Sequence, residues 1–242
     1  MRMNTVVIVA SFIALLVSFW NRNALPHDID YRPEIGEQPR QSATRKQPFT
    51  APYQGIDYLI KPEYEYEIFG MIVSYRHHDG ESRMHRRAGD HLNMLDVCVI
   101  WGDNTANRRL HEIDFWNGIF TCNVRTRDQA AWDAFDMTQL SNNHLISDDE
   151  SIRDRVGGIR IGDQIRVKGW LSSYTGPGGT RGTSTTRTDT GDGACETIYV
   201  NEFEIVEPAT SIWRQSMYAS ALLLVASGVV HFRRPYRPYG KR

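Results

Sequence analysis

A loop rich in histidine carries the first residues that could do chemistry. Residues 76–91 read RHHDGESRMHRRAGDH, and imidazole and carboxylate groups are ligands for zinc, copper and nickel. The spacing matches no closed metal motif, and four arginines in the same loop disfavour a divalent cation. The pattern therefore predicts a solvated hairpin loop and no bound cofactor. The weak metal candidates in it are His77, His78, His85 and His91.

A second candidate is an acidic, glycine-rich segment. Residues 186–196 read TRTDTGDGACE. Aspartic proteases use an Asp-Thr-Gly triplet, but they pair two carboxylates from two copies, and this sequence holds no second copy. The acidic residues also lack the spacing of an EF-hand calcium loop. The segment is interpreted as a turn-rich loop, in which we expect Arg187 to pair with Asp189 or Glu196.

A third candidate is the histidine in LSNNHLISDDE, residues 140–150. His144 beside asparagines could belong to a hydrolytic site, but only folding could bring Ser184 or Cys195 to it as a nucleophile. The favoured interpretation is a turn between two helices with satisfied polar groups. The candidate ligand-binding residues are Asn143, His144, Ser184, Arg187, Asp189 and Glu196, and no catalytic residue is assigned.

The chain has three cysteines, Cys98, Cys122 and Cys195. An odd number leaves at least one of them without a partner inside the chain. One disulfide and three buried thiols fit the sequence equally well, and the pairing stays open.

The elements that must position these residues are mainly β-strands. Three strand-like runs come first, then two helical segments, then two more strands. The second helical segment begins with a capping box, Ser147 followed by Glu150. This order predicts a mainly β fold with a helical insert, a small OB-like five-stranded barrel. The expected strands are residues 63–75, 93–102, 118–125, 164–171 and 196–206, and the expected helices are 127–139 and 147–158.

Two apolar runs enclose this region. Nineteen uncharged residues separate Arg2 from Arg22, and eighteen separate Arg214 from Arg233. A membrane-spanning helix needs about 20 apolar residues. No small-x-small cleavage site follows the first run, which favours a retained anchor over a signal peptide. The expected parts are an N-terminal transmembrane anchor at 1–22, a Pro-rich linker at 23–54, an OB-like extracytoplasmic domain at 55–208, a C-terminal transmembrane helix at 209–233 and a basic cytoplasmic tail at 234–242.

Charge sets the expected orientation. The last ten residues hold five basic groups and no acidic one, and basic flanks favour the cytoplasmic side. Two spans return the chain to its starting side, so both termini should be cytoplasmic. The central domain should then lie in the periplasm of a bacterial-type inner membrane. The net charge of −1 gives no electrostatic case for binding nucleic acid.

The second apolar run carries small residues seven positions apart. Such residues fall on one side of a helix and let another helix approach closely. They predict packing against the first span or against a helix of a partner membrane protein. They are Ala219, Ser220, Ala226, Ser227 and Gly228.

Four stretches, in order VCVIWG, LSNNHLI, RIGDQIRVKGWL and STTRTDTGDGACE, resemble uncharacterised bacterial membrane-anchored proteins. The last is the most specific, a Ser-x-x-Arg-x-Asp-Thr-Gly-x-Gly-Ala-Cys-Glu segment from Ser184 to Glu196. The likeness covers about residues 55–207. It implies location and domain extent, and it implies no activity.

Two functional interpretations follow. The favoured one is a membrane-anchored binding or accessory module for an envelope glycan, a peptide or a partner membrane protein. The alternative is a hydrolase or metal-dependent enzyme that uses the 184–196 loop with His144. An enzyme is the less favoured class because no activated nucleophile is evident. Convergence of His144, Asp189 and Glu196 in one pocket would favour it.

Overall fold

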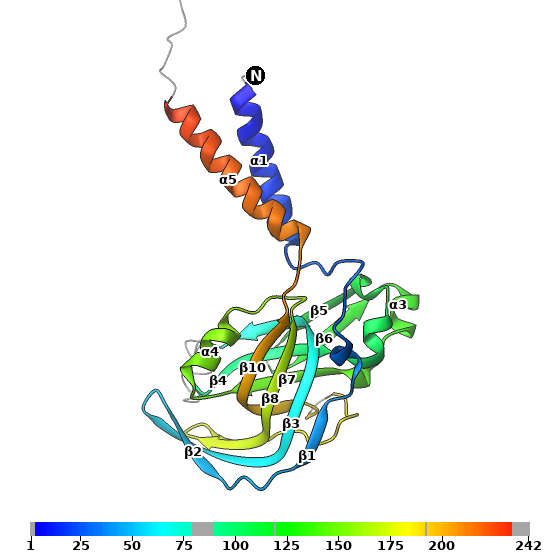
Figure 1. The fold of residues 1–242 in the computed structure, drawn as a ribbon, viewed down its shortest axis with the longest axis vertical. Helices are drawn as coiled ribbons and strands as arrows, with labels where there is room; N and C mark the ends of the chain where they lie inside the picture. The colour runs from blue at the N-terminus through cyan, green and yellow to red at the C-terminus, as the bar shows by residue number, and fades with distance from the viewer. Residues whose placement is uncertain (1–2, 79–89, 119, 192, 234–242) are drawn as a thin grey trace, which may run out of the picture. The chain divides into compact units, whose positions relative to one another are not determined.

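The structure is a computed structural model of the whole chain, and it describes residues 3–78, 90–118, 120–191 and 193–233 (Figure 1). The chain divides into two units. One comprises Met1–Ala24 with Thr210–Arg242, and the other is Leu25–Ala209. Every candidate site residue lies in the second unit.

The first unit is a pair of helices, α1 (Met3–Asn21) and α5 (Ile212–Arg233). Both are long and apolar enough to cross a membrane. The Asn4 side-chain amide donates a hydrogen bond to the backbone carbonyl of Ser227, at 3.2 Å. Large apolar side chains such as Phe12 and Leu222 are exposed. The buried residues are polar instead: Ser11, Ser18, Arg214, Ser220 and Ser227.

The second unit is mainly β sheet (Figure 1). The main sheet has the order β1-β3-β4-β7-β10-β8-β9, with β2 paired to β3. Because β3 also pairs with β8, the pairings of β3, β4, β7, β10 and β8 close on themselves. The strands are β1 (Arg40–Ala43), β2 (Phe49–Tyr53), β3 (Ile56–His77), β4 (Asn93–Ile100), β5 (Ile113–Asn117), β6 (Cys122–Thr126), β7 (Leu140–Ile146), β8 (Gln164–Gly176), β9 (Gly179–Arg181) and β10 (Glu196–Glu207).

Strand β4 is buried along its whole length, because both faces of the sheet are covered there. On one face its residues pack into the core enclosed by the closed pairings, with side chains such as Val97 and Leu95. On the other face lies a hairpin of β5 and β6, together with the short helix α3 (Gln129–Asp133). This second cover creates a protected outer face, on which polar groups can be held away from water.

Helix α4 (Glu150–Gly157) confirms the second helical segment of the sequence analysis. Ile152 and Val156 pack on the core, as their spacing requires. The N-cap is Asp149, and the capping box expected at Ser147 is wrong. The Asp149 carboxylate accepts hydrogen bonds from the first-turn backbone amides. Single-turn 3₁₀ helices lie at Pro33–Gly36, Gly102–Ala106, Leu110–Glu112 and Met137–Gln139.

The third strand of the closed pairings is β7, where the sequence analysis expected a turn between helices. The expected third strand at residues 118–125 instead contributes β6 to a separate two-stranded sheet. Residues 127–139 form only α3 and one 3₁₀ turn. The error has a physical cause. Strand β7 is buried but polar on both faces, so its sequence shows no apolar alternation.

The segment expected as a Pro-rich linker, residues 23–54, contains β1 and β2, both paired to β3. It also buries Ile35 and Ala51 completely. Strand pairing is made by backbone groups, so it needs no apolar periodicity in the added strand. Pro52 fits because it lies in a strand that pairs only with β3.

Candidate functional site

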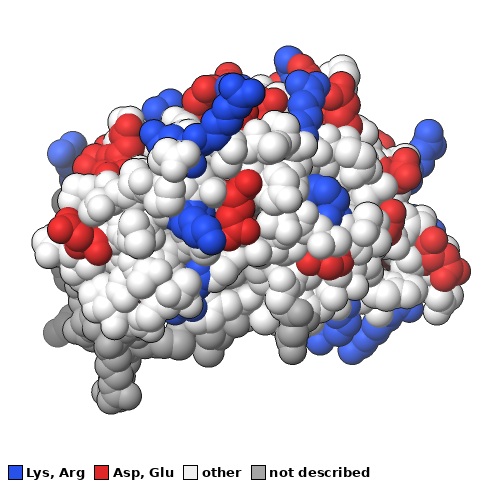
Figure 2. Space-filling view, turned by 90° about the horizontal axis from the view of Figure 1, so that it is seen from below, with Lys and Arg blue, Asp and Glu red and all other residues white. Residues whose placement is uncertain are grey.

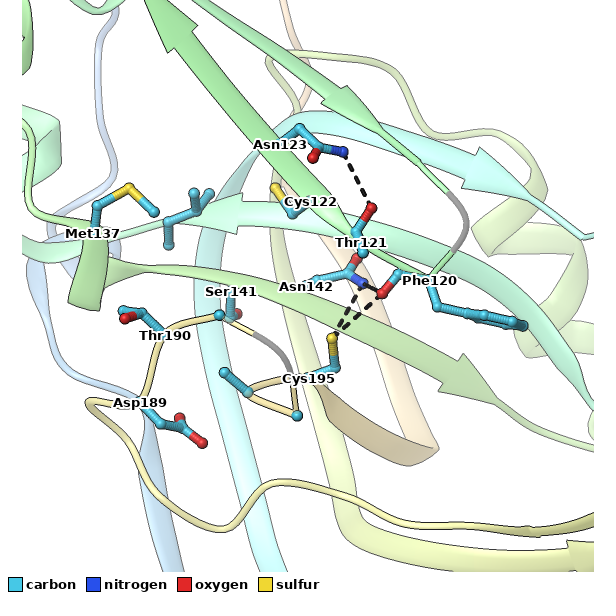
Figure 3. Close-up of a pocket in the computed structure, with 14 residues that line it drawn as sticks. Phe120, Thr121, Cys122, Asn123, Met137, Ser141, Asn142, Asp189, Thr190 and Cys195 are labelled. Carbon is cyan, nitrogen blue, oxygen red and sulfur yellow. Dashed lines mark hydrogen bonds between the residues drawn. The ribbon is translucent and has the colours of Figure 1, made fainter.

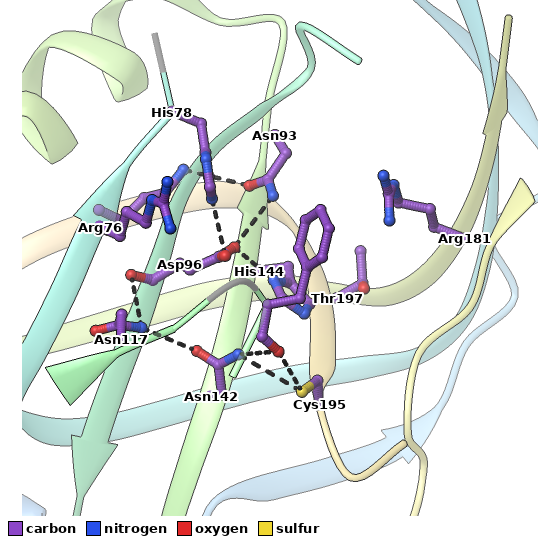
Figure 4. A network of polar contacts seen from close by, with 12 residues as sticks. Arg76, His78, Asn93, Asp96, Asn117, Asn142, His144, Arg181, Cys195 and Thr197 are labelled. Carbon is purple, nitrogen blue, oxygen red and sulfur yellow. Dashed lines mark hydrogen bonds and ion pairs between the residues drawn. The ribbon is translucent and has the colours of Figure 1, made fainter. Parts of the chain in front are cut away.

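Three neighbouring strands place polar side chains on the outer face of the main sheet. Between antiparallel β4 and β7, Asp96 lies opposite His144. Between parallel β7 and β10, His144 lies opposite Thr197. Cys195 directly precedes β10 and lies on the same side as these residues (Figure 4). The alternating residues that face the core instead are Val97, Leu145 and Ile198.

A buried carboxylate organises the centre of the site. The Asp96 side chain is fully buried, and its Oδ1 lies 2.5 Å from Nδ1 of His144. The Asn93 amide donates a second hydrogen bond to the same oxygen, at 3.1 Å. His78 brings Nε2 to 2.8 Å from Oδ2, within ion-pair distance. Figure 4 shows these side chains converging on Asp96. The carboxylate therefore fixes the orientation of the His144 ring.

Cys195 is the one cysteine outside a disulfide. The Asn142 amide donates to its Sγ at 3.5 Å, and the thiol donates to the Phe120 carbonyl at 3.5 Å (Figure 3). His144 lies on the same face of the sheet as this thiol, and both residues line one cavity. Because Nδ1 of His144 is taken by Asp96, Nε2 is the ring nitrogen left for Cys195.

Electrostatics make the histidine a cation at neutral pH. Burial opposes the charge on His144, but hydrogen bonds to Asp96 and to Cys195 outweigh it and raise its pKa to about 9. Burial also disfavours the Asp96 carboxylate, yet hydrogen bonds from His144 and His78 hold its pKa well below the usual range.

A disulfide holds the hairpin over this thiol. Cys98 of β4 is bonded to Cys122 of β6, with a Cα–Cα distance of 5.8 Å. Two residues before Cys122, Phe120 has a backbone φ of 56°, a conformation uncommon outside glycine. Such backbones persist where the surroundings fix them, often at functional sites. Here the Phe120 carbonyl accepts hydrogen bonds from both Asn142 and Cys195.

Cavities reach Cys195 from two sides. One, of about 450 Å³, is lined by His144, Cys195, Tyr174, Arg181, Thr183 and Ser184, among others. The other, of about 290 Å³, opens between the 189–195 loop and the hairpin (Figure 3). A reactant could therefore approach the sulfur while the opposite face of the thiol stays held by protein. A thiol, a base in contact with it and a carboxylate that orients the base form the arrangement used for nucleophilic acyl transfer.

Two of the sequence candidates lie at this site. His144 and Ser184 both line the larger cavity. The Ser184 hydroxyl donates to the Asp189 carboxylate at 2.5 Å, and it accepts from the Thr186 amide at 3.1 Å. These hydrogen bonds of Ser184 stabilise the conformation of its loop. Asp189 lines the smaller cavity.

Three other candidates face the core side of the sheet. Arg187 pairs with Glu196 at 2.7 Å, which confirms the expected ion pair, and it donates to the Tyr66 hydroxyl at 2.8 Å. Burial raises the pKa of Glu196 to about 7, and Arg187 offsets part of that rise. Asn143 lies opposite Glu196 in the sheet. His144, Asp189 and Glu196 therefore do not converge in one pocket.

The histidine-rich loop lies largely at residues 79–89, outside the described residues, and so does the candidate His85. Within the described part of the chain, no group of three or more His, Cys, Asp or Glu side chains forms a possible metal site. His78 contacts Asp96 instead, and the His91 backbone amide donates to the Tyr58 hydroxyl. His77 is exposed, and partial desolvation of its ring lowers its pKa.

The sequence analysis missed Asp96 and Asn142, and it named Cys195 only as a nucleophile that folding could bring to His144. A signal was present in NMLDVCVI, where a carboxylate interrupts an otherwise apolar strand. A charge in such a place must be buried and paired. Comparison of the chain with protein-family models and with curated proteins finds no match. The chemistry of the site therefore has to be argued from its geometry.

Proposed function

We propose that this protein is a membrane-anchored cysteine hydrolase or acyltransferase acting outside the cytoplasm. The observation that carries the proposal is that Cys195 and His144 line one cavity while the buried Asp96 carboxylate holds the His144 ring from behind. In this arrangement, Cys195 is the nucleophile, His144 moves the proton and Asp96 orients His144. The substrate is an acyl donor, such as an ester, a thioester or an amide.

The reaction has two steps. The Cys195 thiolate attacks the carbonyl carbon of the donor, the bond to the leaving group breaks, and the leaving group takes the proton of the His144 imidazolium. Water then adds to the thioester while neutral His144 takes its proton, and the carbon–sulfur bond breaks to release the acid. Thiolate and imidazolium are restored. An amine or alcohol in place of water gives acyl transfer.

Several features support the location. A disulfide persists in oxidising compartments, and the Cys98–Cys122 bond suits the periplasm. The two terminal helices expose apolar side chains and bury serines between them, the reverse of a helix pair in water. With the basic tail, this favours both termini in the cytoplasm. We also interpret the closed pairings as an OB-type barrel, since the OB-fold is built from five strands.

On the face in Figure 2, basic and acidic side chains are interspersed.

The small-residue face of α5 should hold α1 against it. Ser220 and Ser227 are buried, and replacing both by leucine should separate the two helices because the larger side chains do not fit. We expect lower abundance of the protein in membranes and weaker cross-linking between the spans. The control is leucine at two exposed positions, Tyr218 and Val225. Equal abundance and cross-linking in all three proteins would contradict the packing role.

Turnover of activated esters and thioesters by the full-length protein in detergent tests the function. Cys195→Ala should lose at least about 10³-fold in rate, because the nucleophile is removed. Ser184→Ala is the matched control: it removes a hydroxyl from the same cavity and should keep activity within about tenfold. Equal loss in both variants, or no difference from wild type in Cys195→Ala, would contradict the proposal.

The second candidate is a binding module for an envelope glycan, a peptide or a partner membrane protein. The observation that favours it is the capping of Cys195 by the Phe120 carbonyl and the Asn142 amide. Under this alternative the cavity binds its ligand with no covalent step. Cys195→Ala would then retain full function, so the same variant separates the two.

A further inference from the structure

One wall of the larger cavity presents an arginine in a fixed position. Arg181 ends strand β9, and its Nε donates to the Asp90 carboxylate at 2.9 Å. Asp90 is buried and also accepts a hydrogen bond from the Tyr174 hydroxyl, at 3.0 Å. The Arg181 guanidinium lies over the Phe120 ring, 4.5 Å from its centre. The carboxylate and the ring together set both the position and the plane of the guanidinium.

The remaining nitrogens of this guanidinium are available to a ligand. Arg181 is 38 % exposed and lines the cavity that also contains Cys195 and His144 (Figure 4). Among the described residues, its two terminal nitrogens have no hydrogen-bond partner, since only Nε is engaged. A planar arginine with both terminal nitrogens free is suited to a carboxylate, which it can bind through two parallel hydrogen bonds.

We propose that Arg181 binds a carboxylate of the acyl donor, so that the site acts on substrates with a free carboxylate beside the reacting carbonyl. This rests on the proposed function and narrows it to a substrate class, of which a peptide with a free C-terminus is one member. Because Asp90 and Phe120 hold Arg181 in place, little side-chain freedom is lost when the carboxylate binds.

The test uses two alkylating reagents that differ at one end. The first reagent, iodoacetylglycine, ends in a carboxylate. The second, iodoacetylglycine amide, ends in a neutral primary amide. Both alkylate Cys195, and peptide mass spectrometry of the full-length protein gives the rate at that residue. We expect the carboxylate reagent to react about tenfold faster than the amide in the wild type, the size of a charge-assisted hydrogen bond. Arg181→Gln should abolish this rate ratio, and Arg181→Lys should retain part of it.

Two controls isolate the guanidinium. Arg125→Gln removes an exposed arginine from the hairpin, outside the cavity, and should leave the ratio as in the wild type. Arg181→Gln removes the ion pair between Arg181 and Asp90, a change that by itself can repel an anion or loosen the fold. The double variant with Asp90→Asn also removes the Asp90 charge, and its ratio should stay near one. A ratio restored in the double variant would overturn the proposal.

The alkylation test of Arg181 can fail or succeed independently of the turnover test of the proposed function. Alkylation needs only the thiol, so the ratio can be measured whether or not acyl transfer occurs. A wild-type ratio near one, or a tenfold ratio that persists in Arg181→Gln, rejects Arg181 as the carboxylate site and leaves the role of Cys195 standing. Absence of ester turnover with a ratio that depends on Arg181 rejects the enzyme and leaves an anion-binding cavity.

Discussion

His144→Gln should lower the rate of Cys195 acylation by about 10²- to 10³-fold at pH 7. The variant lacks the imidazolium, which is the proton donor for the leaving group. Glutamine keeps much of the volume and can still accept or donate one hydrogen bond. The measurement is the rate of acyl-group incorporation with a thioester substrate.

The pH dependence follows from the pKa of His144, raised to about 9. Below that pH the wild type holds the imidazolium, and above it the proton is lost. The deficit of His144→Gln should therefore be largest near neutral pH and should shrink above about pH 9, where the wild type loses the same group.

His78→Gln is the matched control. His78 also contacts Asp96, but from the opposite carboxylate oxygen. We expect less than a tenfold loss in this variant, since His144 still contacts the thiol. A loss as large as that of His144→Gln would place proton transfer on both histidines and contradict the assignment.

Arg187→Met should lower the free energy of unfolding by about 3–5 kcal/mol at pH 8, the cost of leaving one charge of a buried pair alone. Glu196 is buried and bonded to Arg187 at 2.7 Å, and methionine offers no countercharge. Denaturant unfolding of the full-length protein in detergent, followed by near-ultraviolet circular dichroism, measures the difference.

The sign of the pH effect follows from the pKa of Glu196, raised by burial to about 7 from 4.5. Because its pKa is raised, Glu196 binds its proton more tightly in the folded state than in the unfolded state. Its contribution to stability is therefore full below about pH 4.5, the ordinary pKa of the group. That contribution is lost as pH rises through 7. Without Arg187 the pKa should rise further, because the offsetting charge is gone. The destabilisation by Arg187→Met should therefore be smaller at pH 5 than at pH 8.

Two controls accompany Arg187→Met. The double variant with Glu196→Gln should recover part of the stability at pH 8, because no buried charge remains. Arg125→Met breaks an exposed pair with Asp114 of similar length and should cost less than about 1 kcal/mol. A pH-independent loss in Arg187→Met would mean that lost packing, and not the stranded carboxylate, causes it.

The sequence predicts those elements whose burial is one-sided. Helix α4 follows from its acidic start and from Ile152 and Val156 one turn apart, and β8 follows from its alternation. Strand β7 could not be predicted in this way, because Asn143 on its core side and His144 on its outer side are both polar. Strands β1 and β2 depend on backbone pairing with β3, which leaves no side-chain signal.

The candidate site can be recognised only when the register of the strands in the sheet is known. Asp96, His144 and Cys195 are 48 and 51 positions apart in the sequence, and only the pairing of three strands aligns them. The alternative interpretation as an enzyme required His144 and Glu196 in one pocket, but strand alternation sends the two side chains to opposite faces. Sequence spacing within one loop therefore does not show which residues share a pocket.

A peptide-mass measurement of acylated Cys195 tests the central claim most directly. Full-length protein is mixed briefly with an acyl thioester at neutral pH, quenched in acid and digested. The account predicts an acyl group on the peptide that contains Cys195, formed in the wild type and removed on further incubation. The same peptide should stay unmodified in His144→Gln over that time. An unmodified Cys195 in the wild type, or equal labelling of the two proteins, would contradict it.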